Sequence, residues 1–154
     1  MQSKQFWWIP LPAVAIDRVL KLFAQNALSD GEITAIPGFL TWHLTHNPGA
    51  AFSILSGRSI FLIALTLALI AGIVIWLLRS KSMPLIAGIG LWMVAGGGIG
   101  NLLDRIIFGS VIDFIRLDFI SFPIFNPADV FVCIGAGLTL LSLITARREE
   151  DIHE

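Results

Sequence analysis

Four stretches of this 154-residue chain are apolar and long enough to cross a bilayer as helices. They cover about residues 6–28, 59–78, 83–103 and 128–146. The second and fourth are nearly free of charge, the first contains Asp17, Arg18 and Lys21, and the third is rich in glycine. The first stretch begins like a signal peptide. It continues at spanning length without a short small-residue cleavage site, so we expect a retained membrane helix.

Two longer connections, about residues 29–58 and 104–127, separate these stretches. In the first, Leu40, Trp42 and Leu44 alternate with polar residues, which is the period-2 pattern of a half-buried strand. Asn47-Pro48-Gly49 supplies a turn, and residues 51–54 can begin a partner strand. The second connection mixes Phe and Ile with Asp and Arg, which suits a segment lying in the membrane interface.

Basic residues predict the orientation of the four crossings, because short cytoplasmic loops carry an excess of lysine and arginine. With four crossings, one side of the membrane receives Lys4, Arg79, Lys81, Arg147 and Arg148. We therefore expect both termini in the cytoplasm and both longer loops at the outer face of the plasma membrane.

Composition supports a lipid environment, since 56% of the residues are hydrophobic and only 14% are charged. The formal net charge of −1 gives no basic excess for nucleic acid. A lone cysteine, Cys133, excludes an internal disulfide and a metal site made of several cysteines. The length fits a single membrane-embedded domain over residues 1–154.

Two acids lie among apolar residues, Asp113 in the second connection and Asp129 at the entry to the fourth stretch, and the orientation above places both near the outer membrane face. An ionisable group at membrane depth costs about 2.5–3.5 kcal/mol on insertion scales, so each needs a reason. Asp129 alone could be an early-turn residue favoured by the helix dipole. Two carboxylates at one depth can instead share a proton, and one can then activate a water while the other donates to a scissile carbonyl. This aspartic-protease chemistry needs no metal and no cofactor.

Other kinds of site have weaker support in the sequence. His43 and His46 would point to opposite faces of a strand, and we interpret both as surface residues. No Gly-x-Ser-x-Gly elbow is present. The glycine run at residues 96–100 does not follow a strand, as a phosphate loop would, and its Gly96 and Gly100 favour close helix packing instead. Asp17 and Lys21, four residues apart, can neutralise each other on one helix face.

Four motifs in this order and spacing resemble the prolipoprotein signal peptidase (signal peptidase II) family. They are Asn47-Pro48-Gly49-Ala50-Ala51-Phe52-Ser53, Gly100-Asn101-Leu102-Leu103-Asp104-Arg105, Gly109-Ser110-Val111-Ile112-Asp113-Phe114-Ile115 and Phe125-Asn126-Pro127-Ala128-Asp129. Together with the four spans, the resemblance covers nearly the whole chain.

The resemblance implies an α-helical integral membrane protein with four transmembrane helices, a small extracytoplasmic β-cradle and a short interfacial helix. It implies an endopeptidase of the bacterial plasma (inner) membrane that cuts diacylglyceryl-modified prolipoproteins before the lipidated cysteine, in contact with membrane lipid. It also implies inhibition by globomycin-type compounds. The matching catalytic positions are Asp113 and Asp129, and the matching polar positions around them are Asn47, Gly49, Asn101, Asp104, Arg105, Asn126 and Asp17. The sequence departs from the family at Arg18, where glutamine is common.

Two other classes of protein remain open on the residues alone. A small transporter could use Asp17, Asp113 and Asp129 as a relay, although two of these acids lie near one membrane face and no inverted repeat is visible. A noncatalytic assembly factor could bind partners through the glycine face, but it would leave the two aspartates unexplained.

Overall fold

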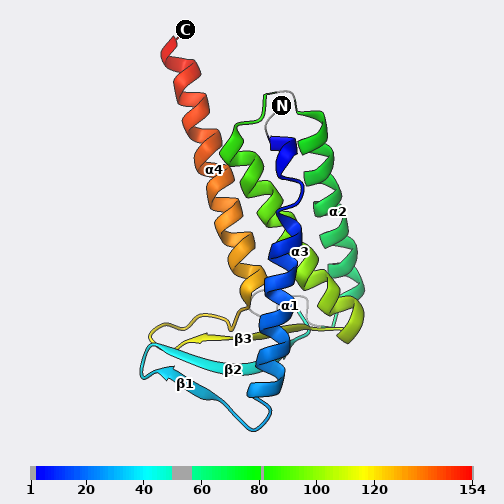
Figure 1. Ribbon diagram of the computed structural model, residues 1–154, viewed down its shortest axis with the longest axis vertical. Helices are drawn as coiled ribbons and strands as arrows, with labels where there is room; N and C mark the ends of the chain where they lie inside the picture. The colour runs from blue at the N-terminus through cyan, green and yellow to red at the C-terminus, as the bar shows by residue number, and fades with distance from the viewer. Residues whose placement is uncertain (1–2, 50–56, 81, 154) are drawn as a thin grey trace.

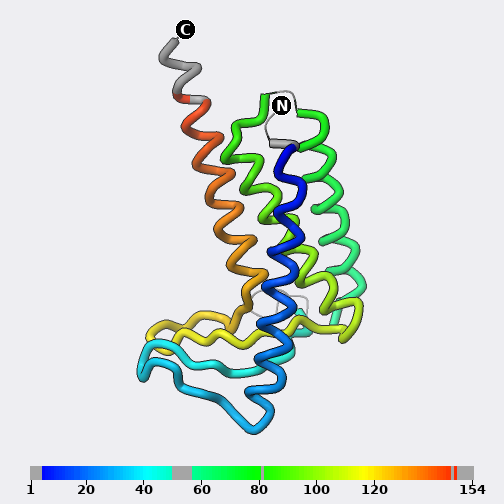
Figure 2. Tube along the Cα trace, in the orientation of Figure 1, coloured from blue at the N-terminus to red at the C-terminus, as the bar shows by residue number. Residues whose placement is uncertain are grey.

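The computed structural model describes residues 3–49, 57–80 and 82–153 as a set of upright helices with a small sheet at one end (Figure 1). The helices are η1 (Ser3–Phe6), α1 (Pro10–Ala27), α2 (Ser59–Arg79), α3 (Leu85–Phe108) and α4 (Pro127–His153). The strands are β1 (Ile33–Ile36), β2 (Leu40–Asn47) and β3 (Val111–Leu117). The chain passes along α1 to the sheet at the far end of the helices, and α4 leads back from the sheet toward the end where α1 begins (Figure 2).

Three of the helices, α2, α3 and the Pro127–Ala146 part of α4, are long and apolar enough to cross a membrane. The 18-residue α1 runs beside α3 and would span about 27 Å at the usual rise per residue (Figure 1). Because it contains three charged residues, Asp17, Arg18 and Lys21, α1 is less apolar than these three helices. The predicted stretches at residues 59–78 and 83–103 agree with α2 and with most of α3, but α3 continues to Phe108. Asp104 and Arg105 therefore lie inside this helix.

The charges of α1 point into the protein. Asp17 and Lys21 are completely buried, whereas Leu11, Val19 and Phe23 are each about 60% or more exposed. The apolar residues of α1 thus form its outer surface and its ionic residues face the neighbouring helices. This reverses the usual arrangement of a helix in water and suits one surrounded by lipid.

Glycines of α3 allow the neighbouring helices to come close. A methyl group on Gly96 would lie 2.8 Å from the Cβ of Ala13 on α1, and one on Gly97 would collide with the backbone oxygen of Ala128 on α4. At Gly100 the added carbon would lie 2.8 Å from the Oδ2 of Asp17. These contacts confirm the packing interpretation of the glycine run, and they show that its faces are covered within one chain.

The sheet has the order β1-β2-β3 with antiparallel neighbours. The strand predicted from Leu40 onward is confirmed as β2, which pairs with β3 through Leu40–Leu117 and Thr45–Asp113. Residues 51–54, proposed as a partner strand, lie outside the described residues. Residues 28–49, 57–58 and 109–126, the described residues between the long helices at the sheet end, contain no helix, so the short interfacial helix implied by the resemblance is not found there.

An aromatic contact joins this sheet to α1. Phe114 of β3 is 1% exposed, packs with Ala24 and Leu28 of the α1 end, and stacks on Trp42 with ring centroids 5.7 Å apart. Since β3 is one of the two elements that carry the conspicuous aspartates, this core fixes the position of Asp113, the residue before Phe114.

Candidate active site

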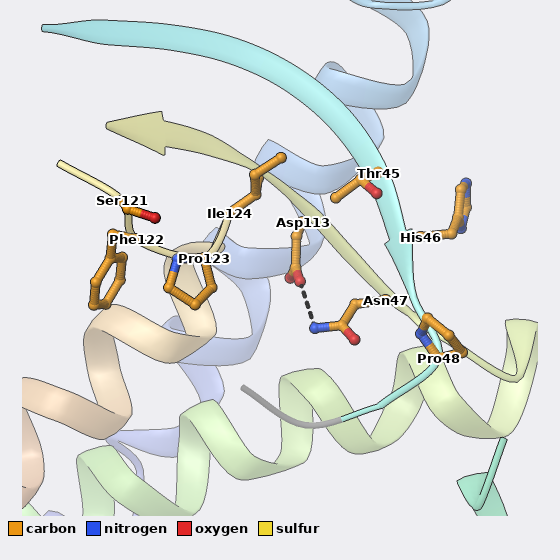
Figure 3. Close-up of a pocket in the computed structure, with 9 residues that line it drawn as sticks. All are labelled: Thr45, His46, Asn47, Pro48, Asp113, Ser121, Phe122, Pro123 and Ile124. Atoms are coloured by element: carbon orange, nitrogen blue, oxygen red, sulfur yellow. Dashed lines mark hydrogen bonds between the residues drawn. The ribbon is translucent and has the colours of Figure 1, made fainter. Parts of the chain in front are cut away.

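Asp113 lies on β3 with only 2% of its surface exposed, and two asparagine side chains donate to its carboxylate. Asn47, at the end of β2, places Nδ2 3.1 Å from Oδ2 (Figure 3). Asn126 places Nδ2 2.6 Å from Oδ1. Burial raises the pKa of Asp113 to about 6. The nearby carboxylate of Asp129 also raises this pKa, whereas the hydrogen bonds from Asn126 and Asn47 lower it. A proton can therefore remain on this group close to neutral pH.

Asp129 lies in the first turn of α4, where Asn101 of α3 donates from Nδ2 to its Oδ1 over 2.7 Å. Asp129 and Asn126 also cap the helix reciprocally. The backbone N–H of Asn126 donates to Oδ2 of Asp129 over 3.2 Å, and that of Asp129 donates to Oδ1 of Asn126 over 3.0 Å. Asp129 is thus the early-turn residue that the sequence allowed, and its other oxygen is held by a different helix.

A chain of two amides connects the two aspartates. Asn126 donates from Nδ2 to Oδ1 of Asn101 over 3.0 Å as well as to Asp113. Asn101 in turn donates to Asp129. Both carboxylates therefore accept hydrogen bonds from one connected set of side chains.

Beneath the amides lies a buried cluster of charges. The Nζ of Lys21 is 2.9 Å from Oδ2 of Asp17, 2.7 Å from Oδ2 of Asp104 and 3.1 Å from Oδ1 of Asn101. Arg18 adds a hydrogen-bonded ion pair with Asp104. With two carboxylates and two cations, the cluster is formally neutral. The pairing of Asp17 with Lys21 expected from their spacing is confirmed.

The two acids of this cluster hold the backbone next to the two aspartates above them. Oδ1 of Asp17 accepts the N–H of Ala128, 3.1 Å away, and Oδ2 of Asp104 accepts the N–H of Ile112, 3.3 Å away. Ala128 and Ile112 immediately precede Asp129 and Asp113 in the chain. The departure at Arg18 is accommodated, because its guanidinium reaches Asp104.

Arg105 and Gly49 position the turn that carries Asn47. The Nη2 of Arg105 donates to the carbonyl oxygen of Gly49 over 2.9 Å, and the N–H of Gly49 donates to Oδ1 of Asn47 over 3.0 Å. Because this orients the Asn47 amide with its oxygen toward Gly49, its Nδ2 faces Asp113. All nine residues selected from the sequence thus belong to one hydrogen-bonded region.

Two cavities of about 450 Å³ each meet at Asn47 and Asp113. The first lies between β2 and the segment at residues 121–124 (Figure 3). The second contains Asp129 and Arg105 and continues along α4 over Val130, Cys133 and Ile134. The first cavity is therefore bordered by the end of β2, and the second is bordered largely by apolar side chains. The carboxylate of Asp113 lies at their junction.

The hydrogen bonds of His43 and His46 lead to other residues, although His46 also lines the first cavity. His43 pairs with Glu32 at 2.9 Å, and His46 contacts Ser110 at 3.4 Å. Lys21 was missed as a site residue, since its spacing to Asp17 indicated only neutralisation. The sequence signal that could have identified Lys21 was the presence of a lysine at membrane depth, where a charged group needs acidic partners.

Comparison with known proteins identifies close relatives. The family profile described as signal peptidase (SPase) II matches residues 9–145. The lipoprotein signal peptidase of Parasynechococcus marenigrum is 40% identical over 135 residues, covering 87% of this chain and 85% of its own. That of Pseudomonas putida is 36% identical over 156 residues, covering 96% and 91%. A solved bacterial membrane enzyme superposes with a TM-score of 0.82 at 30% identity, covering 89% of this chain and 85% of its own.

Proposed function

This chain belongs to the signal peptidase II family, a family of membrane proteases that process lipoproteins, and we propose that Asp113 and Asp129 are its catalytic pair. The observation that carries the proposal is the chain of amide hydrogen bonds connecting the two carboxylates at the junction of two cavities. Raised pKa values in a cleft are typical of functional groups, and the pKa of Asp113 is raised by burial.

In the proposed reaction the pair holds one proton. The ionised carboxylate takes a proton from a water molecule, and the protonated one donates a hydrogen bond to the scissile carbonyl oxygen as the water attacks. The resulting tetrahedral intermediate collapses when the leaving nitrogen is protonated from the pair. Because the two groups titrate together, neither role is assigned to one residue.

The substrate is a lipoprotein precursor, and we place its cleavage before the lipidated cysteine. The peptide would lie in the cavity beside Thr45 and Asn47, which follow the part of β2 that pairs with β1, since unpaired strand edges bind extended peptides through backbone hydrogen bonds. The diacylglyceryl chains would follow the apolar cavity along Val130 and Ile134, which leads from the carboxylates along a helix suited to lipid. Globomycin-type inhibitors are expected to compete for the same space.

We further propose α1 as the fourth crossing, with the sheet at the outer face of the bacterial inner membrane. Its inward-facing Asp17 and Lys21 and its exposed Leu11, Val19 and Phe23 give it a lipid-compatible surface despite its charges. Four crossings also leave Arg79 and the basic C-terminal segment on the cytoplasmic side.

The test is cleavage of a diacylglyceryl-modified prolipoprotein peptide by purified protein, with product masses to locate the cut. Asp113→Asn and Asp129→Asn are compared with wild type and with Asp30→Asn. The control removes an exposed carboxylate of the first outer loop, away from the amide chain. We expect at least a 1,000-fold loss in the first two variants and near wild-type rates in the control, on the order of what removal of a catalytic group costs.

Retained cleavage in either catalytic variant would contradict the dyad. Wild-type failure on a substrate that a related enzyme cuts would contradict the peptidase assignment itself and favour the ion-relay alternative. Unfolding temperatures of each variant, measured in the same detergent, separate loss of chemistry from loss of fold.

A further inference from the structure

Lys21 is the least expected buried group in the protein, because its ammonium reaches the amide chain as well as its two acids. Its side chain is 1% exposed and belongs to α1, whereas the amide that it touches belongs to α3. Three oxygens lie 2.7 to 3.1 Å from Nζ: those of Asp17 and Asp104 form ion pairs with it, and Oδ1 of Asn101 accepts a hydrogen bond from it. If Lys21 only neutralised Asp17, the contact with Asn101 would be unnecessary.

That contact decides which way the Asn101 amide points. Its Oδ1 lies 3.1 Å from Lys21 Nζ and 3.0 Å from Asn126 Nδ2, so two donors occupy its two lone pairs. A reversed amide would turn its own N–H groups toward those donors. Its Nδ2 must therefore face the remaining partner, Oδ1 of Asp129, at 2.7 Å.

We propose that Lys21 is a positioning residue that fixes the Asn101 amide so that it donates to Asp129, and thereby maintains the ionised form of the catalytic pair. This inference rests on the proposed function above. Lys21 touches neither aspartate of the pair and acts through Asn101 and through its charge. Without it, one donor to Asn101 Oδ1, from Asn126, remains, and the charge-assisted hydrogen bond from Asn101 to the ionised form of the pair is less firmly held.

The charged groups facing this region come from four elements. They are Asp17 and Arg18 on α1, Asp104 and Arg105 on α3, Asp113 on β3 and Asp129 on α4. Loss of the Lys21 charge leaves the buried cluster with a net charge of −1 beside the pair. The added negative charge and the less firmly held Asn101 donor act in the same direction, because both make it harder for the pair to give up its first proton.

The experiment is the pH dependence of kcat for cleavage of the diacylglyceryl-modified peptide. In Lys21→Met we expect the acid limb to move upward by about one pH unit, the size of one hydrogen bond to a charged group, with KM changed by less than about twofold. Arg18→Met is the matched control. It removes a positive charge from the same cluster and the same helix, but among the described residues the ion pairs of Arg18 are with Asp17 and Asp104 and not with the amide chain.

A second variant covers the possibility that an unpaired buried acid unfolds the protein. Lys21→Met with Asp17→Asn restores a neutral cluster and keeps a side-chain oxygen for the N–H of Ala128. We expect this double variant to unfold near the wild-type temperature and still to show the displaced acid limb. Lys21→Arg, which retains charge and donors, should recover part of the wild-type profile.

A wild-type acid limb in the folded double variant would overturn the inference, as would an equal displacement in Arg18→Met. Asp129→Asn, measured in parallel, separates these results from failure of the proposed function. If Asp129→Asn is inactive while the Lys21 variants keep the wild-type profile, the dyad stands and the role of Lys21 is wrong. If Asp129→Asn cleaves normally, the dyad itself is wrong and the positioning role is overturned with it.

Discussion

A methyl group added at Gly97 tests whether the close packing of α3 against α4 keeps the site residues on these two helices at their observed separation. The new carbon would collide with the backbone oxygen of Ala128 and lie 2.8 Å from Cγ2 of Val132. A backbone atom cannot rotate away as a side chain can. The first turn of α4 must therefore move outward, and Asp129 moves with it.

The expected cost follows from two opposing effects. Overpacking of a well-packed interface costs about 1–3 kcal/mol, while replacement of glycine by alanine within a helix returns up to about 1 kcal/mol. A net loss of about 1–2 kcal/mol in stability remains. The activity should fall further, because the 2.7 Å hydrogen bond from Asn101 to Asp129 crosses the same interface. Displacement of a catalytic group by about 1 Å can cost on the order of 100-fold in rate.

Gly137→Ala is the matched control, since it makes the same chemical change on α4 where nothing lies within 4 Å of the added carbon. We expect this variant to be neutral or more stable by up to about 1 kcal/mol, with wild-type activity. The assays are thermal unfolding in detergent and initial cleavage rates at saturating peptide. Equal stability and equal activity of the two alanine variants would refute the argument from close helix packing.

Two further predictions concern the carboxylates. Asn126→Ala and Asn101→Ala should lower kcat by on the order of 100-fold or more while costing about 1–3 kcal/mol in stability, because each removes a donor to the pair. Unchanged turnover in either variant would contradict the role of the amides. The second prediction concerns pH. The folded-state pKa of Asp113 is raised to about 6 from 3.8, so its contribution to stability is complete below about pH 4 and is lost as pH rises through 6. As pH rises across that range, the unfolding free energy of Asp113→Asn should increase relative to that of wild type by about 3 kcal/mol. A difference between the two proteins that does not depend on pH would exclude a buried, titrating Asp113.

The hydrophobic pattern predicted the helices with least charge well, because lipid imposes a simple length and composition on them. The α2 helix begins at Ser59, the residue expected from the sequence, and ends at Arg79. The end of α3 was placed several residues too early. Asp104 and Arg105 resembled a loop, but their partners on α1 and in the Gly49 turn allow the helix to continue to Phe108.

The strand that carries Asp113 was not recognised as a strand for a related reason. Its residues Val111, Ile112, Asp113 and Phe114 are all buried, so the alternation that identified β2 is absent. The site residues were predictable as a set from the four motifs. Their connections depend on how helices distant in sequence pack, and no spacing along the chain encodes the contact between Lys21 and Asn101.

The buried ionic cluster raises the question of why a membrane helix should retain Asp17 and Lys21 at all. Apolar replacements of a buried ion pair are often neutral or stabilising, so stability alone gives a weak reason. The contacts supply a better one. Asp17 and Asp104 each accept the backbone N–H of the residue before one of the proposed catalytic aspartates, and an apolar side chain would leave these N–H groups unpaired.

A carboxylate at both positions requires buried cations between them, and Lys21 is within 3 Å of both. The same ammonium then orients the amide chain above the cluster. One group of charges thus holds the start of α4 and the strand β3 in place and orients the amides that donate to the proposed pair. Despite its cost in membrane insertion, the cluster fixes the positions of the two proposed catalytic groups, which come from different parts of the chain.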